Sequence, residues 1–232
     1  SPPGYRIAAV SKCLFENTEI SIGIQRNVSK ADVFYIAGKA CPDQWTSDYA
    51  WQSFEFSVPS NIKTKSIDLI INKTRKVILP VIERPTTSHN GLVEVCVSPL
   101  YWYDDWPRLI LFIELWRNAH NAHFILYVKS ISKNVQQVLN YYSRKGYVQI
   151  VSWPDLPTTP GSENANKNVY RLYHTIAQND CLLRTKSEVG VLLDIDEFIY
   201  IKNNQSIVEF MRFKQQQKPK MGSLSFDTVG MK

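Results

Sequence analysis

The stretch VGVLLDIDEFIYI, residues 189–201, places two aspartates directly after an apolar run. Residues 189–193 have the length and composition of a buried strand, and Asp194 and Asp196 follow its end. Alternate residues of an extended chain point to opposite sides, so a turn is needed to bring the two carboxylates together. We therefore predict a strand that ends at residue 193 and a turn that carries the acidic pair.

Strands and helices alternate on both sides of this stretch. The helical starts are marked by Asp104-Asp105-Trp106-Pro107 and by Ser132 and Ser206, which are typical capping residues. A long helix is expected over 166–184, and strands over 92–100, 124–128, 147–153 and 221–226. Repeated strand–helix units predict an α/β fold with a mostly parallel sheet. Ligands of such sheets bind at the carboxyl ends of the strands, which here are residues 98–101, 153–155 and 194–197.

The first part of the chain has a different pattern. Apolar and polar residues alternate with a period of two over 20–24, 54–58 and 66–71, which predicts a small β-sandwich. Residues 83–91, ERPTTSHNG, are rich in turn formers and are expected to form a linker. We therefore predict a β-rich domain over residues 1–88 and an α/β domain over residues 89–232.

Composition excludes several classes of protein. Hydrophobic residues make up 44% of the chain and charged residues 21%, which is typical of a globular protein. The net charge of +6 is spread along the chain without the dense basic stripe of a nucleic-acid-binding protein, and it suits a small anionic ligand. The start SPPGYR is not a signal peptide, and no apolar run could span a membrane. Because the chain begins and ends abruptly, we expect a piece of a longer protein.

Cysteines and glycosylation sequons favour the secretory lumen. The four cysteines contain no CxxC pair, which disfavours zinc and redox sites, and their even number fits two disulfides with three pairings open. Asn-x-Ser/Thr sequons occur at Asn27, Asn72 and Asn204. Together they favour an oxidising compartment. The alternative is a cytosolic protein with coincidental sequons.

The acidic pair predicts a divalent cation site. Asp194 and Asp196 supply the hard oxygen ligands that magnesium or manganese prefers, and phosphate oxygens would complete the coordination shell. A cation held there neutralises the charge that gathers on a diphosphate leaving group. His120 and His123 are close in sequence, but no third ligand is near them, which disfavours a zinc site.

Two other interpretations of the acidic pair stay open. Haloacid-dehalogenase-type phosphatases also carry Asp-x-Asp after an apolar strand and use the first aspartate as a nucleophile. Their motif comes early in the domain and has a small hydroxyl or branched residue where this chain has Phe198, so this interpretation is disfavoured. In the other, the acidic pair is inert and the domain does not catalyse a reaction.

Four segments resemble glycosyltransferase family 92. They are CVSPLYWYDDWPRLILFIELWRNAHNAHFILYV (96–128), YVQIVSWPDLP (147–157), AQNDCLLR (177–184) and LLDIDEFIYI (192–201), and they occur in the family's order. The resemblance covers residues 92–226, and SKCLFENTEI (11–20) is similar to the family's amino-terminal part.

The resemblance implies a GT-A fold, a UDP-sugar donor, Mn²⁺ or Mg²⁺, and transfer of galactose from UDP-galactose to a glycan acceptor. It also implies a single-pass type II membrane protein of the Golgi, whose anchor would precede this piece and whose carboxyl-terminal part would follow it. The alternative from another class is a glycosyltransferase-like binding or structural module without turnover.

Individual roles carry over onto matching residues. Asp196 corresponds to a direct metal ligand, whereas Asp194 corresponds to a contact with the ribose or with a metal-bound water. The end of the first strand is implied to seat the nucleoside. The residues implied to bind the donor are Ser98, Pro99, Leu100, Asp155, Asn179, Arg184 and Asp194.

Alternatives remain for several of these residues. Asp155 is equally well explained as a turn residue, and Arg184 as a surface charge. Cys96 and Cys181 both lie in matching segments and are candidates for a disulfide, the alternative being two buried free thiols. A glycosyltransferase that inverts the sugar needs a general base near the acceptor. Asp227 is the only late carboxylate, and no catalytic residue is assigned.

Overall fold

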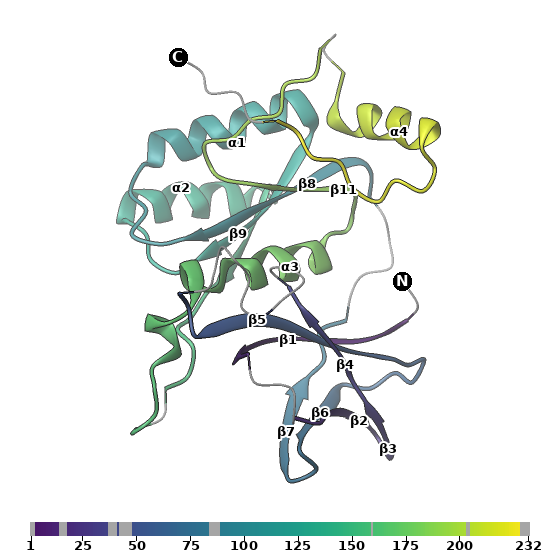
Figure 1. Ribbon diagram of the computed structural model, residues 1–232. Helices are drawn as coiled ribbons and strands as arrows, with labels where there is room; N and C mark the ends of the chain where they lie inside the picture. Colours follow the sequence, from purple (N-terminus) through teal and green to yellow (C-terminus); the bar gives the residue numbers. More distant parts are fainter. Residues whose placement is uncertain are drawn as a thin grey trace. The chain divides into compact units, whose positions relative to one another are not determined.

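The computed structural model describes residues 3–13, 18–36, 41, 48–83, 89–158, 160–202 and 205–227 (Figure 1). Contacts divide the chain into two compact units. The first comprises Ser1–Arg84 and Pro154–Leu183, and the second comprises Pro85–Trp153 and Arg184–Lys232. The sequence predicts one boundary at residue 88, whereas Pro154–Leu183 groups with the amino-terminal strands. Each unit is described by itself below.

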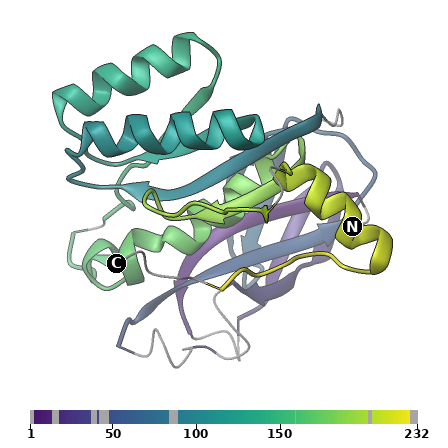
Figure 2. The same ribbon diagram turned by 90° about the horizontal axis from the view of Figure 1, so that it is seen from above.

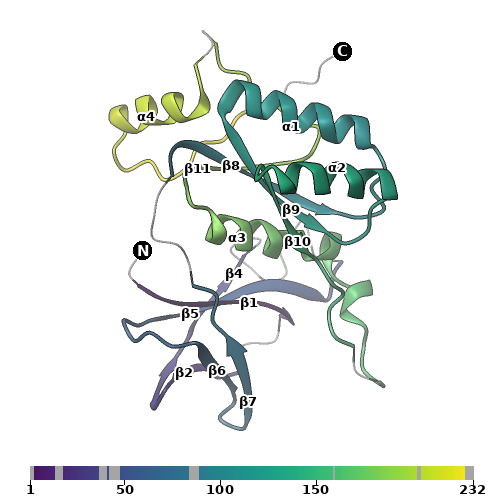
Figure 3. The same ribbon diagram turned by 180° about the vertical axis from the view of Figure 1, so that it is seen from behind.

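The first unit contains two antiparallel sheets. One has the strand order β1-β5-β4 and the other the order β3-β2-β6-β7 (Figure 3). The strands are β1 (Gly4–Lys12), β2 (Ile20–Ile24), β3 (Asn27–Lys30), β4 (Asp32–Tyr35), β5 (Trp51–Pro59), β6 (Ser66–Ile71) and β7 (Arg75–Pro80). The alternating pattern of the sequence therefore does produce strands here.

A single hydrophobic core joins the two sheets of this unit. Ile22 of β2 and Phe54 and Phe56 of β5 are buried in it, together with Ile7 and Ile67. Because both sheets bury side chains in the same core, the arrangement is the expected sandwich.

All four cysteines lie among the described residues, and none of them is free. Cys13 pairs with Cys41 within the first unit. Cys96 and Cys181 are also disulfide-bonded, so the alternative of two buried free thiols is wrong.

The helix expected over residues 166–184 is interrupted. Two 3₁₀ turns, η1 (Ala165–Lys167) and η2 (Tyr170–Tyr173), precede a shorter helix, α3 (His174–Arg184). Arg171 and Tyr173 have φ angles of 41° and 52°, in the left-handed region that a right-handed helix cannot contain. The helical pattern of the sequence therefore overestimates the length of the regular helix.

The second unit is built on a parallel four-stranded sheet with the order β10-β9-β8-β11. The strands are β8 (His89–Leu100), β9 (Ala122–Val128), β10 (Val148–Ser152) and β11 (Ser187–Leu193). Two helices, α1 (Trp106–His120) and α2 (Lys133–Arg144), cover one face of this sheet (Figure 2), and α4 (Ile207–Gln217) follows β11. This is the mostly parallel α/β arrangement that the sequence predicts.

The core of this unit lies between the sheet and its helices. The largest fully buried side chains there include Trp116 and Leu109 of α1, Leu139 of α2 and Phe124 of β9. Each comes from the apolar face of its element, which is why the helices take these positions.

Capping residues begin the helices where the sequence places them. The Asp105 side chain accepts a hydrogen bond from the backbone N–H of Arg108 at 3.1 Å. Ser132 caps α2, and Ser206 forms a capping box with Glu209 at the start of α4. These three predicted starts are confirmed.

The strand predicted over 221–226 is absent: the described residues 221–227 form neither strand nor helix. The ring of Phe226 instead lies against Phe210 of α4, with ring centroids 6.0 Å apart. This contact covers the ring only in part, because Phe226 is 40% exposed. Among the described residues, no helix is both long and apolar enough to cross a membrane.

Candidate functional site

The strand order creates a switch point between β8 and β11. Along the chain, β8, β9 and β10 extend the sheet in one direction, and β11 then adds to the opposite side of β8. In open parallel sheets, ligands bind at the carboxyl ends of the strands where the order reverses in this way. Leu193 pairs with Val97, so Asp194 emerges beside the last residues of β8.

Residues 194–197 form a closed turn, which we call the acidic turn. The backbone N–H of Glu197 donates to the carbonyl of Asp194 at 3.1 Å. In return, the N–H of Asp194 donates to a carboxylate oxygen of Glu197 at 3.0 Å. The predicted turn after the strand is confirmed. Because Glu197 is engaged in the turn, Asp194 and Asp196 are its exposed carboxylates.

Two side chains of α1 hold the backbone that follows Asp196. The indole N–H of Trp116 donates to the carbonyl of Glu197 at 3.1 Å. The Nε2 atom of His120 lies 2.9 Å from the carbonyl oxygen of Ile199. The Nδ1 atom of the same ring accepts a hydrogen bond of 3.2 Å from the backbone N–H of Ile207. These partners require the neutral tautomer that carries its proton on Nε2.

His120 therefore supports the loop after β11 through both of its ring nitrogens. The sequence does contain a signal for this role, because Trp116 and His120 are four residues apart on the buried face of α1. Helical spacing places Trp116 on the apolar face of this helix but does not indicate its hydrogen bond to Glu197. Polar atoms on a buried helix face need partners, and here those partners are backbone groups of the loop after β11.

Arg108 is a further residue that the sequence analysis missed. Its guanidinium lies 3.0 Å from Asp105 and 3.9 Å from Asp196, so it connects the start of α1 with the acidic turn. Both Arg108 and Asp196 are more than half exposed, so the longer contact adds little stability. The guanidinium is therefore available to a ligand that carries phosphates.

The end of β8 is shaped by hydrogen bonds to the loop after β9. The carbonyl of Leu100 accepts from the N–H groups of Lys129 at 2.9 Å and Ser130 at 3.2 Å. Pro99 and Leu100 are buried and Ser98 is half-buried. Three aromatic residues that follow, Tyr101, Trp102 and Trp106, are exposed.

Tyr103 reports the electrostatics of this edge. Burial of the Tyr103 hydroxyl is the largest cause that raises its pKa, which reaches about 12. The negative charge of Asp105 is the second cause, and the charges of Asp196 and Asp104 raise the pKa further. The positive charge of Arg108 opposes the rise. The hydroxyl is buried and has no hydrogen-bond partner among the described residues, and it stays protonated at neutral pH.

Three of the predicted donor-binding residues lie on or next to α3. In the first unit, Asn179 donates its amide to Glu55 of β5 at 3.0 Å, and the charge of Asp155 acts on Tyr173. Arg184, the last residue of α3, is half-buried. The roles of these three residues in donor binding stay predictions.

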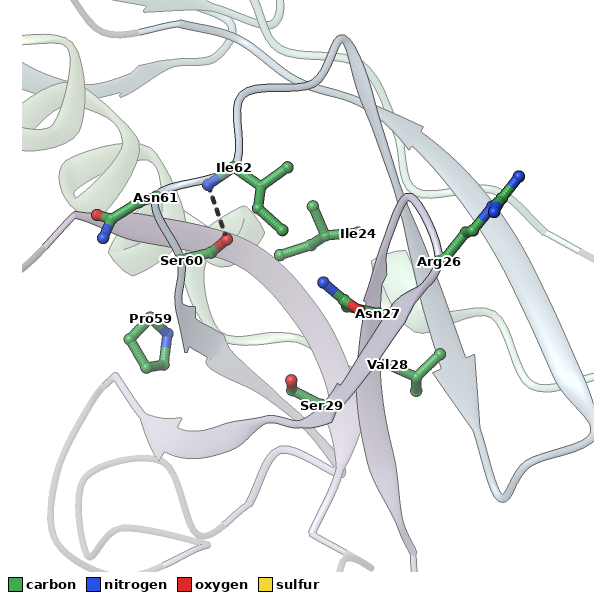
Figure 4. Close-up of a pocket in the computed structure, with 9 residues that line it drawn as sticks. All are labelled: Ile24, Arg26, Asn27, Val28, Ser29, Pro59, Ser60, Asn61 and Ile62. Carbon is green, nitrogen blue, oxygen red and sulfur yellow. Dashed lines mark hydrogen bonds between the residues drawn. The ribbon is translucent and has the colours of Figure 1, made fainter.

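Two of the three sequons fall on described residues. Asn27 starts β3 and lines a hollow of about 530 Å³ in the first unit. Figure 4 shows the side chains of Asn27, Ile24 and Ile62 facing into this hollow, with Arg26 pointing away. Asn72 lies in the turn between β6 and β7, where its side chain accepts from the N–H of Glu19 at 2.8 Å. Asn204 lies outside the described residues.

The acidic turn fits a hard divalent cation in its donor chemistry. It presents two exposed carboxylates two residues apart in sequence, and the ion pair between Asp196 and Arg108 is itself exposed. Among the described residues, no three His, Cys, Asp or Glu side chains gather as a complete ligand set. A cation at this turn would therefore take its remaining oxygens from substrate phosphates and water.

Comparison with known proteins identifies the family. The model of glycosyltransferase family 92 matches residues 92–232, which is more than half of the chain. The chain belongs to glycosyltransferase family 92. The resemblance noted in four sequence segments is thereby confirmed.

Three family 92 proteins of Caenorhabditis elegans are among the relatives. The first is 27% identical over 152 residues, which cover 63% of this chain and 30% of the relative. The second is 28% identical over 123 residues, or 50% of this chain and 24% of the relative. The third is 24% identical over 163 residues, or 61% of this chain and 32% of the relative. The chain thus spans about a third or less of the length of these relatives.

The family 92 match includes the whole candidate site. It begins within β8 and continues through α1 and the acidic turn, whereas strands β1–β7 precede it. Family membership therefore concerns the same segment in which the structure brings Arg108 and Asp196 together.

Proposed function

We propose that this chain carries the donor-binding part of a glycosyltransferase with a GT-A-like fold. The enzyme transfers a hexose, galactose from UDP-galactose, to a glycan acceptor. The observation that carries the proposal is the acidic turn, which presents Asp194 and Asp196 at the switch point of a parallel sheet. Family 92 membership supports glycosyl transfer as the class of reaction.

Asp196 is the proposed direct ligand of Mn²⁺ or Mg²⁺. Asp194, which lies closer to the strand, is proposed to meet the ribose or a metal-bound water. The bound cation would supply positive charge to the diphosphate. The guanidinium of Arg108 would supply a further positive charge beside the cation, because it lies 3.9 Å from Asp196 and is about half exposed.

The transfer exchanges one bond for another at the anomeric carbon of the sugar. The bond from this carbon to the diphosphate oxygen breaks, and UDP leaves with the electron pair. A bond to the acceptor oxygen forms, and the acceptor proton passes to a base that we do not assign to a residue of this chain. The protein stabilises the charge that accumulates on UDP, and this is the largest catalytic contribution expected of such a site.

A second candidate is a donor-binding or structural module without turnover. It stays open because transfer needs a base near the acceptor hydroxyl, and no residue of this chain is assigned that role. A haloacid-dehalogenase-type phosphatase is the third candidate. Release of phosphate from an aryl phosphate, abolished by Asp194→Asn, would favour the phosphatase.

We further propose that the protein works in the Golgi lumen, anchored by a membrane segment outside this chain. Two observations support an oxidising compartment: all four cysteines are in disulfides, and the sequon residue Asn27 is exposed. Secretion from cultured animal cells should add a glycan at Asn27. Asn27→Gln should then remove the mass of one glycan, whereas an unchanged mass would contradict glycosylation at this residue.

Isothermal titration with UDP in the presence and absence of Mn²⁺ tests donor binding. We expect binding that requires the metal and is lost in Asp194→Ala and Asp196→Ala. Asp32→Ala, which removes an exposed carboxylate of β4, is the matched control and should bind like the parent. If the parent does not bind UDP in either condition, the proposed function is wrong. Binding without release of sugar from UDP-galactose would favour the module without turnover.

A further inference from the structure

Trp102 is held in an arrangement that folding alone does not favour. Its side chain is 88% exposed, although indole is among the largest apolar side chains. Its backbone φ is 49°, in the left-handed region that disfavours residues with a β-carbon. Backbone outliers of this kind concentrate at functional sites, where the surrounding structure maintains them.

Hydrogen bonds on both sides fix the backbone of Trp102. Its N–H donates to the hydroxyl of Ser130 at 2.7 Å. The N–H of Tyr103 donates to the carbonyl of Ser130 at 3.2 Å, and the carbonyl of Tyr103 accepts from Ser132 at 3.0 Å. The exposed indole therefore projects from an anchored segment and not from a free loop.

Trp102 also lies at the same end of the sheet as the acidic turn. It follows β8, whose neighbour β11 leads into the turn, and the negative charge of Asp196 acts on the hydroxyl of Tyr103, the next residue in the chain. A ligand that reaches both places needs phosphates at one end and a flat ring at the other. Nucleotides have this combination.

We propose that Trp102 is the stacking surface for the nucleobase of the nucleotide whose diphosphate binds at the acidic turn. This inference rests on the proposed function, because the diphosphate sets the position of the base. Every base has a face that stacks on an aromatic ring, and replacing such a ring by alanine weakens nucleic-acid binding measurably. Because the backbone of Trp102 is already fixed, less conformational entropy of the protein is lost when a ligand binds to the ring.

The test compares UDP and UDP-galactose binding to the parent, Trp102→Ala and Trp102→Phe, by titration calorimetry with Mn²⁺. Trp102→Ala should weaken both ligands by the same factor, about 5- to 100-fold, whereas Trp102→Phe should lose less because a ring remains. Phe213→Ala removes an exposed aromatic ring from α4 and is the matched control, with unchanged binding. Thermal unfolding of each variant confirms that it is folded.

The outcomes separate this inference from the proposed function. If the parent binds UDP and Trp102→Ala binds it equally well, stacking is wrong and donor binding stands. A loss confined to UDP-galactose would place the indole against the sugar and contradict stacking on the base. If the parent binds neither ligand, donor binding fails and the inference fails with it. If Trp102→Ala does not fold, UDP binding to Trp102→Phe is compared with the parent instead, together with the quenching of tryptophan emission by UDP in each protein.

Discussion

At the scale of single residues, the acidic turn depends on side chains outside it. Trp116 and His120 bond to three backbone groups between Glu197 and Ile207, and these bonds fix the path of the chain after Asp196. A carboxylate pair can hold a cation only if its backbone does not move on binding. In the proposed metal site, Trp116 and His120 would therefore affect metal affinity without touching the metal.

Trp116→Phe tests this support. It removes the indole N–H and leaves the carbonyl of Glu197 without its partner. We expect a loss of about 1–3 kcal/mol in the free energy of unfolding, measured by urea denaturation, and weaker binding of UDP with Mn²⁺. Leu111→Ala alters an exposed position of the same helix and should change stability by less than about 0.5 kcal/mol. Equal stability of Trp116→Phe and the parent would show that the bond contributes nothing.

Glu94 makes the folding stability of the second unit depend on pH. Its buried carboxylate accepts from the N–H of Ser187 at 2.9 Å and from the N–H of Lys186, and His123 lies 3.4 Å away. Burial raises its pKa, but His123 and the two N–H groups lower it by more, so that the pKa lies below the ordinary value of 4.5. The folded state therefore holds this proton less tightly than the unfolded state does.

The stability that Glu94 contributes is therefore present above about pH 4.5 and is lost as the pH falls through the lower pKa of the folded state. Glu94→Gln should lower the free energy of unfolding by about 1–3 kcal/mol at neutral pH. It should also flatten the acid part of the stability curve, measured by urea denaturation between neutral pH and about pH 3. Glu83→Gln, at an exposed position, should leave that curve unchanged. A curve for Glu94→Gln as steep as that of the parent would contradict this account.

At the scale of elements, caps and periodicity were predictable from the sequence and interruptions were not. Asp105, Ser132 and Ser206 start their helices as predicted, because a capping side chain acts on backbone groups only two or three residues away. The break at Arg171 and Tyr173, where φ is positive, is not indicated by any local pattern of the sequence. The sequence of residues 221–226 looks like that of a strand. A strand also needs a neighbouring strand to pair with, and the sequence of one segment does not show whether such a neighbour exists.

The capping box of α4 allows a test at this scale. Ser206→Ala removes the hydroxyl that accepts from the N–H of Glu209 and should destabilise the protein by about 1 kcal/mol. Amide hydrogen exchange should increase in the first turn of α4, whereas Ser206→Thr should keep most of the protection. Gln215→Ala, at an exposed position of the same helix, serves as the control. Unchanged exchange in Ser206→Ala would show that α4 does not depend on its cap.

At the scale of the whole molecule, the division into compact units does not follow the order of the chain. The sequence suggests one boundary, because composition changes near residue 88. The structure groups Pro154–Leu183 with the amino-terminal strands. The bridge between Trp51 and Val169 and the bond from Asn179 to Glu55 belong to this grouping. Such contacts join residues more than one hundred positions apart, and sequence periodicity carries no information about them.

The candidate site could be predicted only in part, because some of its residues are close in sequence and others are brought together by the fold. Asp194 and Asp196 are adjacent to a clear strand, so their turn followed from local sequence. Arg108 and Trp116 reach this turn from a helix some eighty residues earlier, which only the fold reveals. The family resemblance implies that Leu100 helps to seat the nucleoside. Its side chain lies in the core and its carbonyl accepts two hydrogen bonds, whereas the side chains of Tyr101 and Trp102 that follow are exposed.

The disulfide between Cys13 and Cys41 tests the first unit as a whole. It joins residues 28 positions apart in a unit with two small sheets. Replacing both cysteines by serine should destabilise this unit by about 2–4 kcal/mol, because the unfolded chain regains entropy. Hydrogen exchange of β1 and β5 provides the measurement, with the strands of the second unit as an internal reference. No change in exchange would contradict a stabilising role.

The most direct test of the account is a titration of Mn²⁺ followed by electron paramagnetic resonance, in which free Mn²⁺ gives the signal and bound Mn²⁺ does not. With UDP present, the protein should reduce this signal beyond what UDP alone does, and Asp196→Asn should restore it. If the parent leaves the signal unchanged, or if Asp196→Asn retains the metal as tightly as the parent does, the acidic turn is not a metal–diphosphate site.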